Sequence, residues 1–426
     1  MKVIRTFGPS AREAERRLRQ IEDRSGVATA RLEPSVRRIL SSIRRGGDKP
    51  LRAYAMRFDG LQPESLLRVS KQEMATAWDQ TPLTLRRAMQ TAAKNIRQFA
   101  HWQMPKNWSR STAGRTVGQR CLPLASVGCY VPGGRYPLPS TLLMTAIPAR
   151  VAGVERVVVV SPRPARETLA AAHLAGVEEM YRIGGAQAIA ALAYGTASIP
   201  RVEKIVGPGN LYVTTAKRLV AFDCAIDMMA GPTEIAVASE SGDPAWIAAD
   251  LVAQAEHDPE ALAILITANQ TLAKATAKEV DRQAASNAIA RKSLAAHSVI
   301  FLTRDHAETL AVTNRIAAEH LTVDDRDDLA HIRNAGSIFI GGTTPQSMGD
   351  YVSGPNHVLP TGRAARVRGG LSVYDFLRIV TTQEYSPAGL AALGDAAISL
   401  ANAEGLVAHA ASVAVRMASG TSGGKR

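Results

Sequence analysis

An acid and a base stand next to each other at Glu319-His320. The apolar spacing before them predicts a helix from about Asp305 to His320, which would put both groups at one helix end. Neighbouring acid and base side chains can carry out two proton transfers in one pocket. A polar helix end, where the helix dipole favours histidine, explains the pair better when it is taken by itself.

Side chains that could bind a metal are scattered along the second half of the chain. Gln254 and His257 are three residues apart on a helix expected from Pro244 to His257. Two further candidates, Asp350 and His357, lie in the Gly/Pro-rich run Gly349–Pro360, which we expect to be irregular. Imidazoles and a carboxylate are normal zinc ligands, and an amide oxygen can complete the set. The candidates do not show the fixed spacing that marks many metal sites. From residue type alone, each of these side chains is therefore more simply interpreted as structural or surface-exposed. The candidates are Gln254, His257, Asp350, His357, Glu404 and His409.

Three glycine-rich turns could approach a ligand closely: Gly128–Gly134, Gly184–Gln187 and Gly207–Asn210. The second and third follow strand-like runs, and small residues at strand ends of an open α/β sheet admit a phosphate or a ribose. The dinucleotide fingerprint G-x-G-x-x-G is missing. Spacing therefore supports NAD binding only weakly, and the first turn equally fits a plain loop.

The elements that would position these groups change in character near Pro123. The first hundred residues are expected to be helical, with one apolar stripe in Thr84–Ala100. Continuous Val/Ile runs then alternate with helices, which predicts parallel sheets covered on both faces, most simply as two doubly wound α/β units. After Leu371 the chain is expected to return to helix, with a good helix start at Ser386-Pro387. The predicted strands are Val154–Ser161, Glu179–Ile183, Ile235–Ser239, Ala261–Thr267, Val299–Thr303 and Ser337–Ile340.

Composition excludes several classes of protein. The 426 residues are 46% hydrophobic and 21% charged, as in a folded soluble chain of two or more domains. The sequence contains no uncharged apolar run of about 18 residues, so no membrane span is predicted. The first residues do not resemble a secretion signal. Three cysteines imply no disulfide framework, so we expect a cytoplasmic protein. The net charge of +13 raises the question of nucleic acid, but the basic residues are dispersed among acids without a binding motif, which favours a solvated surface.

Eight motifs, in order from about Arg37 to Arg416, resemble the histidinol dehydrogenase family. Their combination is far more specific than any one of them. They are YVPGG at Tyr130–Gly134, IGGAQAIAALAYGT at Ile183–Thr196, IVGPGN at Ile205–Asn210, DMMAGPTE at Asp227–Glu234, QAEHDP at Gln254–Pro259, AEHL at Ala318–Leu321, GDYVSGPNHVLPT at Gly349–Thr361 and AEGLVAH at Ala403–His409.

The resemblance implies an α/β fold of two incomplete Rossmann-like, doubly wound domains, similar to aldehyde dehydrogenases, with small helical terminal segments exchanged in a homodimer. Residues 1–25 would be an N-terminal helical segment. Residues 26–125 and 240–375 would form the first domain, with most zinc ligands and the catalytic pair. Residues 126–239 would bind NAD, and the helical tail 376–426 would reach the partner's active site.

The resemblance also implies the reaction: two-step oxidation of L-histidinol, through L-histidinaldehyde, to L-histidine, with two NAD per substrate and one zinc ion per subunit. In that reading His320 takes the hydroxyl proton and Glu319 activates water for the second step. The implied zinc ligands are Gln254, His257, Asp350 and His409. Implied NAD contacts are Tyr130, Gln187 and Asn210. The zinc ligands and His320 would also contact substrate, together with Thr233, His357 and Glu404.

Two positions depart from the family pattern. Thr233 stands where the family usually has Ser, which keeps the hydroxyl. Gln346 stands where a Glu is common, four residues before Asp350, and the lost carboxylate could weaken the hold on a cationic substrate. The run YVPGGRYPLPS at Tyr130–Ser140 also differs from several members. Two alternatives therefore stay open: a paralogue that oxidises another small alcohol such as a sulfonated diol, and a non-catalytic or nucleic-acid-binding protein on the same scaffold.

Overall fold

The computed structural model describes residues 1–24, 27–133, 136–229 and 231–420. The chain divides into two compact units. The first combines Met1–Gln103 with Leu124–Phe376, and the second combines Met104–Pro123 with Leu377–Arg426. Each unit is described by itself. No helix of the described residues is both long enough and apolar enough to cross a membrane.

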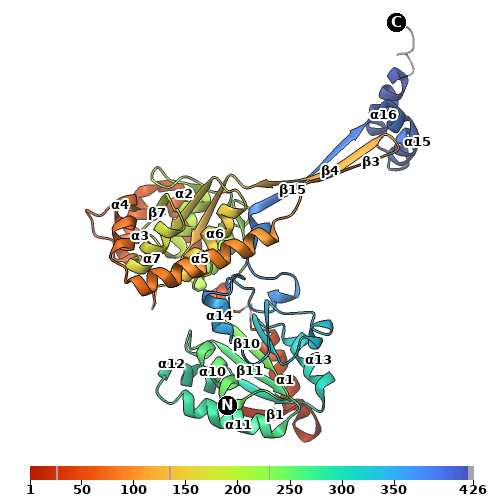
Figure 1. Ribbon diagram of the computed structural model, residues 1–426. Coiled ribbons are helices and arrows are strands. Elements are labelled where there is room, and N and C mark those ends of the chain that lie inside the picture. The colour runs from red at the N-terminus through yellow and green to blue at the C-terminus, as the bar shows by residue number, and fades with distance from the viewer. Residues whose placement is uncertain (25–26, 134–135, 230, 421–426) are drawn as a thin grey trace. The chain divides into compact units, whose positions relative to one another are not determined.

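The first sheet of the larger unit has six parallel strands in the order β1-β12-β11-β10-β13-β14. Strands β1, β10 and β11 are labelled in Figure 1. Every residue of β11 is buried, because helices cover both faces of the sheet. One face packs on α1 and α13, and the other packs on α10, α11 and α12. The strands are β1 (Lys2–Arg5), β10 (Glu234–Ala238), β11 (Leu262–Thr267), β12 (Val299–Leu302), β13 (His320–Val323) and β14 (Ser337–Ile340). The helices are α1 (Ala11–Glu22), α10 (Pro244–Ala255), α11 (Gln270–Gln283), α12 (Ala288–Ala296) and α13 (His306–Ile316).

The second sheet has the order β2-β7-β6-β5-β8-β9, and all its pairs are parallel except β2 with β7. Helices α2, α3, α8 and α9 pack together beside it, as do α4, α5, α6 and α7. The strands are β2 (Arg68–Val69), β5 (Ser126–Tyr130), β6 (Arg156–Val160), β7 (Glu179–Tyr181), β8 (Lys204–Val206) and β9 (Ala225–Ile226). The helices are α2 (Val27–Gly46), α3 (Asp48–Asp59), α4 (Lys71–Asp79), α5 (Leu83–Gln103), α6 (Pro139–Val151), α7 (Arg166–Leu174), α8 (Gly185–Tyr194) and α9 (Leu211–Val220).

Both sheets reverse their strand order at a central strand. In the first sheet β11 and β12 lie on one side of β10, whereas β13 and β14 lie on the other. In the second sheet β6 and β7 lie on one side of β5, and β8 and β9 on the other. This is the doubly wound order, and the predicted α/β class with parallel sheets is confirmed.

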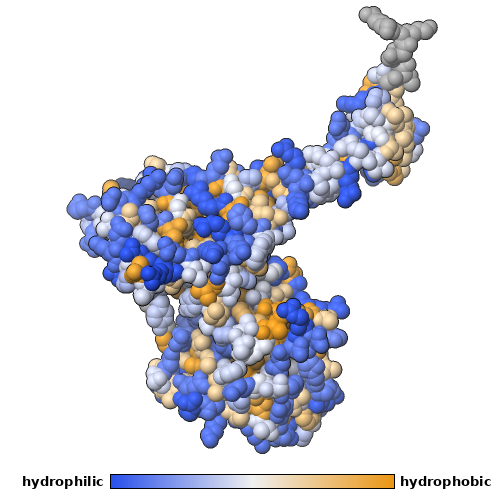
Figure 2. All heavy atoms as spheres, viewed as in Figure 1, coloured by the Kyte–Doolittle hydropathy of each residue, from blue (hydrophilic) through white to orange (hydrophobic). Residues whose placement is uncertain are grey.

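The smaller unit is a three-stranded antiparallel sheet followed by a helical hairpin. Strand β15 (Leu377–Tyr385) pairs with β4 (Arg115–Pro123), which pairs with β3 (Trp108–Thr112). The hairpin is α15 (Pro387–Ala403) and α16 (Val407–Gly420). Ser386 Oγ accepts a hydrogen bond from the Gly389 N–H, which caps α15 at the predicted start. Apolar side chains lie on the surface of this hairpin (Figure 2).

The structure contradicts the predicted segment boundaries in five places. Strand β10 belongs to the first sheet, although it lies within the predicted segment 126–239, and residues 104–123 belong to the smaller unit. Strand β2 pairs with β7 and α2 packs on α8 and α9, so residues 27–103 belong with the second sheet rather than with 240–375. The N-terminal segment is not only helical, because β1 pairs with β12 at the edge of the first sheet. The C-terminal segment begins with β15 rather than with helix.

Two predicted local conformations are also wrong. Helix α13 ends at Ile316, because Ala317 adopts a left-handed conformation with φ 54° and donates its N–H to the Thr313 carbonyl. Asp350 lies on the short helix α14 (Gln346–Tyr351) rather than in an irregular run. Short 3₁₀ helices lie at Gly8–Ser10, Asp327–Ala330, Ala364–Arg366 and Val373–Phe376.

Candidate active site

The predicted acid–base pair lies at the amino edge of the first sheet. His320 is the first residue of β13 and is in register with Ile235 of β10 and Ser337 of β14. Because the strands are parallel, their amino ends meet at one edge, which also carries Thr233 and Glu234. The pair is therefore held by a sheet edge and not, as predicted, by a helix end.

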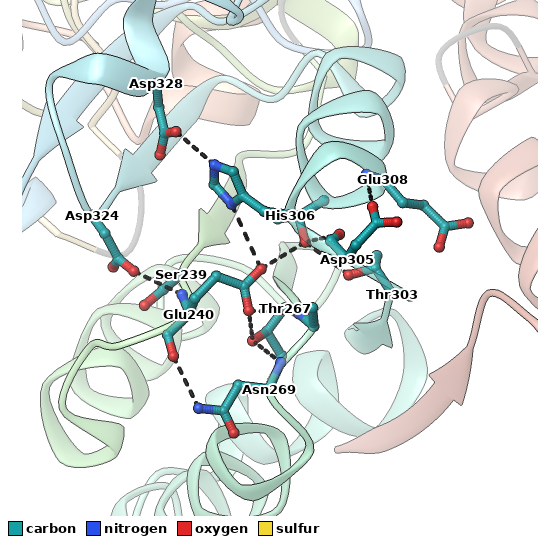
Figure 3. Close-up of polar contacts among 12 residues, drawn as sticks. Ser239, Glu240, Thr267, Asn269, Thr303, Asp305, His306, Glu308, Asp324 and Asp328 are labelled. Carbon is teal, nitrogen blue, oxygen red and sulfur yellow. Dashed lines mark hydrogen bonds and ion pairs between the residues drawn. The ribbon is translucent and has the colours of Figure 1, made fainter.

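The opposite, carboxyl edge of this sheet is filled by its own side chains (Figure 3). Glu240 accepts hydrogen bonds from Thr267 Oγ1 at 3.1 Å and Thr309 Oγ1 at 2.8 Å. Asp324 accepts the Glu240 N–H at 2.7 Å, and His306 Nε2 lies 2.8 Å from an Asp328 oxygen. Ligands of doubly wound folds usually bind at this edge. Here the network joins the ends of β10, β11 and β13 to α13, and the predicted catalytic pair lies at the other end.

Glu319 is a buried carboxylate with two donors on one oxygen. Its Oε2 accepts Thr233 Oγ1 at 2.5 Å and the Glu234 N–H at 2.9 Å. Burial raises the pKa of Glu319 above its usual value, although the charge of His320 and the two hydrogen bonds oppose the rise. A carboxyl group with a raised pKa beside neutral donors is suited to accept a proton from water near neutral pH.

His320 is buried between two carboxylates. Its Nδ1 donates to the Glu234 carbonyl at 3.2 Å, and its Nε2 lies 3.5 Å from Asp350 Oδ1. Burial opposes the charged imidazole, but Glu319 and Asp350 outweigh it and raise the pKa of His320 to about 9. Nε2 is buried without a hydrogen-bond partner. The ring lines a pocket, and Nε2, which is paired only loosely with Asp350 at 3.5 Å, is the nitrogen available for chemistry.

Asp350 and His357 also line the pocket, and Phe339 stacks on His320. His357 Nδ1 donates to the Asp350 carbonyl at 2.7 Å, and burial lowers the pKa of His357. The neutral ring can then accept from Thr141 Oγ1, which lies 3.2 Å from Nε2. Thr141, on α6, is a site residue that the sequence analysis missed, because nothing in the sequence relates it to a histidine 216 residues away.

Gln254 connects the predicted acid–base pair to Gln346, the position where this chain departs from the family pattern. Gln254 Nε2 donates to Thr233 Oγ1, which in turn donates to Glu319. Gln346 Nε2 donates to Gln254 Oε1 at 2.7 Å. Gln254 and Gln346 are each 1% exposed. These hydrogen bonds fix the orientation of the Gln254 carboxamide. Gln346 donates to Gln254 Oε1, which is the atom expected to bind a metal if Gln254 is a ligand.

The predicted zinc ligands are only partly brought together. Gln254 ends the buried face of α10, whereas His257 lies just beyond that helix and is exposed. Burial would raise the pKa of Asp350, but His320, His357 and His257 together lower it. Among the described residues no three His, Cys, Asp or Glu side chains converge closely enough to hold a metal ion. His409, on α16, and Glu404, just after α15, belong to the smaller unit, so their approach to this site stays a prediction.

Glu234 adds an unpredicted buried carboxylate, and its titration gives a testable expectation. Burial and the charge of Glu319 raise the pKa of Glu234 to about 7 from a usual value of 4.5. A raised carboxyl pKa stabilises the fold below pH 4.5, and this stabilisation is lost as pH rises through 7. Glu234→Gln should therefore increase the unfolding free energy of the metal-free chain by about 3 kcal/mol at pH 8 and by little at pH 4.5.

Denaturant unfolding at both pH values would measure this difference. Glu64→Gln, at an exposed carboxylate, is the matched control and should change neither value. A Glu234→Gln chain that gains no stability at pH 8, or gains the same amount at both pH values, would contradict the expectation.

The predicted NAD contacts lie at the carboxyl edge of the second sheet. Tyr130 ends β5, and its hydroxyl accepts the Gly185 N–H at 3.1 Å. Asn210 follows β8 and caps α9, since its Oδ1 accepts the N–H groups of Tyr212 and Val213. Gln187 is on α8 and is 2% exposed. Gly134, the last residue of the first glycine-rich turn, and the following Arg135 lie outside the described residues.

Two further groups at this edge were not foreseen as functional. Asp59, the last residue of α3, accepts a hydrogen bond from Gln187 Nε2. Lys217 forms a buried ion pair with Asp227 and donates to the Gly207 carbonyl at 3.0 Å, which fixes the turn before Asn210. The Asp59 contact joins residues 128 positions apart, which spacing along the chain does not reveal, whereas the partners of Lys217 lie ten residues away on either side.

Comparison with known proteins gives a consistent result. The family model described as histidinol dehydrogenase matches residues 22–417. The chain is 46% identical to histidinol dehydrogenase of a Synechococcus strain over 425 residues, which cover 96% of this chain and 97% of the relative. It is 48% identical to that of Agrobacterium fabrum, with coverage of 90% and 92%. The crystal structure of histidinol dehydrogenase from Elizabethkingia anophelis superposes with a TM-score of 0.92 at 32% identity, covering 99% of both chains.

Proposed function

The chain belongs to the histidinol dehydrogenase family of oxidoreductases in histidine biosynthesis, and from this premise we propose that it oxidises L-histidinol to L-histidine in two steps. L-histidinaldehyde is the intermediate, and two NAD are reduced per substrate. The observation that carries the proposal is the buried Glu319–His320 pair beside a pocket lined by Asp350 and His357. Two bases aimed at different points suit two successive oxidations of one carbon.

We infer that zinc is held by Gln254, His257, Asp350 and His409. The donor set is chemically suitable, because it combines two imidazoles, a carboxylate and an amide oxygen. Gln254 Oε1 is fixed by Gln346, and Asp350 is kept ionised by its histidine neighbours. When bound, the ion supplies a fixed positive charge that orients the imidazole and amine of the substrate.

His320 is the base of the first step. Its Nε2 removes the hydroxyl proton while a hydride leaves the alcohol carbon, so that the alcohol becomes an aldehyde. NAD supplies the hydride acceptor in both steps. Asp350 is one of the carboxylates that raise the pKa of His320, so the imidazole would move towards the neutral form that a base requires if Asp350 held a cation. Burial of the ring keeps bulk water from this exchange.

Glu319 is the base of the second step. Its carboxylate takes a proton from the water that attacks the aldehyde, and the hydrated carbon then loses its second hydride. Thr233 Oγ1 and the Glu234 N–H hold one carboxylate oxygen, Oε2, so the other oxygen, Oε1, is the one proposed to take the proton. Retention of the aldehyde in the pocket between the two steps protects it from loss to solvent.

The smaller unit supports a dimer with shared sites. Nearly all residues of β15 are exposed, and α15 buries only Gly389 and Gly394. Val407 is 71% exposed and Leu400 is 67% exposed. Exposed apolar surface of this kind is typical of an association face. We propose that this unit packs on a second copy of the chain and supplies Glu404 and His409 to its active site.

The three free cysteines suit a reducing cytoplasm.

Turnover of L-histidinol tests the function directly. Purified protein, loaded with zinc, should reduce two NAD for each histidinol consumed and should release histidine. Chelation should remove this activity and zinc should restore it. A sulfonated diol offered as the alternative alcohol should give no comparable rate. Zinc-loaded, folded protein that does not oxidise histidinol would overturn the proposal.

Gln346 gives a separate prediction about the metal. In Gln346→Glu the donor to Gln254 Oε1 is replaced by a carboxylate, which adds negative charge beside the ligand set. Groups that contact metal ligands change metal affinity by about 10–100-fold, so we expect zinc to bind about tenfold more tightly. Competition with a chromophoric chelator would measure this. Gln346→Met, neutral and of similar size, is the control and should not tighten binding. Equal or weaker zinc binding by Gln346→Glu would contradict the prediction.

A further inference from the structure

The end of helix α3 carries a buried charge that the proposed mechanism does not use. Asp59 is the last residue of α3 and is 5% exposed. Its Oδ2 accepts the Gly184 N–H at 3.0 Å and Gln187 Nε2 at 3.0 Å. We propose that Asp59 is a positioning residue of the dinucleotide site, which holds the Gln187 carboxamide so that its Oε1 faces the cofactor. The inference rests on the proposed use of NAD.

The local fold explains how Asp59 reaches this place. Gly60 adopts a left-handed conformation with φ 66° and ends α3, so the chain turns away directly after the aspartate. Burial raises the pKa of Asp59, and the bonds from Gly184 and Gln187 lower it again only in part. A buried carboxylate costs free energy unless it is hydrogen-bonded. Both hydrogen bonds that Asp59 accepts come from residues at the start of α8.

That helix start is the beginning of α8, at the carboxyl edge of the second sheet. Gly184, the N-cap residue, gives its N–H to Asp59, and Gly185 gives its N–H to the Tyr130 hydroxyl. These are two of the four N–H groups that a helix N-terminus can offer to a phosphate. With both engaged by protein side chains, fewer N–H groups remain for a phosphate at Gly184–Gln187. The side chains of this turn therefore gain importance for cofactor binding.

Gln187 is the side chain whose chemistry is fixed in this way. A free carboxamide can turn by 180° and offer either its oxygen or its nitrogen. Asp59 can only accept when ionised, so it selects the orientation in which Nε2 points towards it. Oε1 is then the group left for the cofactor. It would take a hydrogen-bond donor of the dinucleotide, either a ribose hydroxyl or the amide of the nicotinamide.

Equilibrium binding of NADH, measured by fluorescence, tests the inference without turnover. Asp59→Ala frees the carboxamide and should raise the Kd for NADH by about tenfold or more, the range for a hydrogen bond to a charged group. Asp59→Asn keeps an acceptor in place and should lose much less. If Asp59 acts through Gln187, the Asp59→Ala change should cost little further affinity in a Gln187→Ala chain.

A matched control separates positioning from general stability. Asn269→Ala removes the cap of α11, where Oδ1 accepts two N–H groups, and should leave NADH binding unchanged. Zinc affinity should stay the same in all variants. Additive losses in the Asp59/Gln187 double variant, or an Asp59→Ala chain with unchanged Kd, would overturn the inference. If the unmodified chain itself fails to bind NADH, the proposed function fails instead.

A second pair keeps the test decisive if Asp59→Ala does not fold. Gln187→Glu places a second carboxylate against Asp59 and removes the donor, so NADH affinity should fall below that of Gln187→Ala. Adding Asp59→Asn to Gln187→Glu removes one charge and supplies a donor, and it should restore most of the lost affinity. No rescue by the second change would count against an orienting contact between these two side chains.

Discussion

The Glu319→Gln chain is expected to lose aldehyde oxidation by about 10²–10⁴-fold, the usual contribution of a positioned base, while alcohol oxidation falls much less. The carboxamide keeps an oxygen that can accept from Thr233 Oγ1 and the Glu234 N–H, so the site should stay assembled. Only the ability to take a proton from water is removed. His320, which serves the alcohol step, is left with its Nδ1 bond to the Glu234 carbonyl.

Separate assays of the two half-reactions measure this difference. NAD reduction with L-histidinol as substrate reports the first step, and NAD reduction with L-histidinaldehyde reports the second. His320→Asn is the matched comparison and should depress the alcohol step at least as strongly as the aldehyde step. Equal losses in both half-reactions of Glu319→Gln, with zinc content unchanged, would show that the two side chains do not have separate roles.

Glu319 and Glu234, the two buried carboxylates of this site, differ in how far the sequence could predict them. The adjacency of Glu319 and His320 was visible in the sequence, but their support was assigned to a helix end. A left-handed Ala317 ends the helix three residues before His320, and alanine gives no signal for that conformation. Glu234 was invisible as a functional group, because only the parallel register of β10 and β13 places it beside Glu319.

The parallel sheets could be predicted because their buried strands are continuous apolar runs of the expected length. Strand β14 was predicted to the residue, and β6 and β10 were displaced at their ends by one or two residues. Which helices cover which sheet could not be predicted in the same way. Residues 27–103 were assigned to the wrong sheet, because the pairing of β2 with β7 joins positions more than a hundred residues apart and rests on two residues per strand.

Mixed dimers of two inactive chains are expected to regain activity, if the smaller unit serves its partner's site. A Glu319→Gln chain lacks the second base, and a His409→Asn chain lacks a proposed zinc ligand. In a hybrid dimer one site then combines an intact Glu319 from one chain with an intact His409 from the other. Complete oxidation to histidine should reach about half the wild-type rate in purified hybrids, because isologous association creates one such site per dimer.

The reciprocal hybrid makes the result unambiguous. A chain that carries both changes, paired with an unmodified chain, has no intact site if residues are shared across the dimer, and one intact site if each site is built within a chain. The first hybrid should therefore be active and the second inactive, with two affinity tags used to isolate each. The opposite pattern would place Glu404 and His409 in their own chain's site. It would also leave the exposed apolar side chains of β15, α15 and α16 without the role proposed for them.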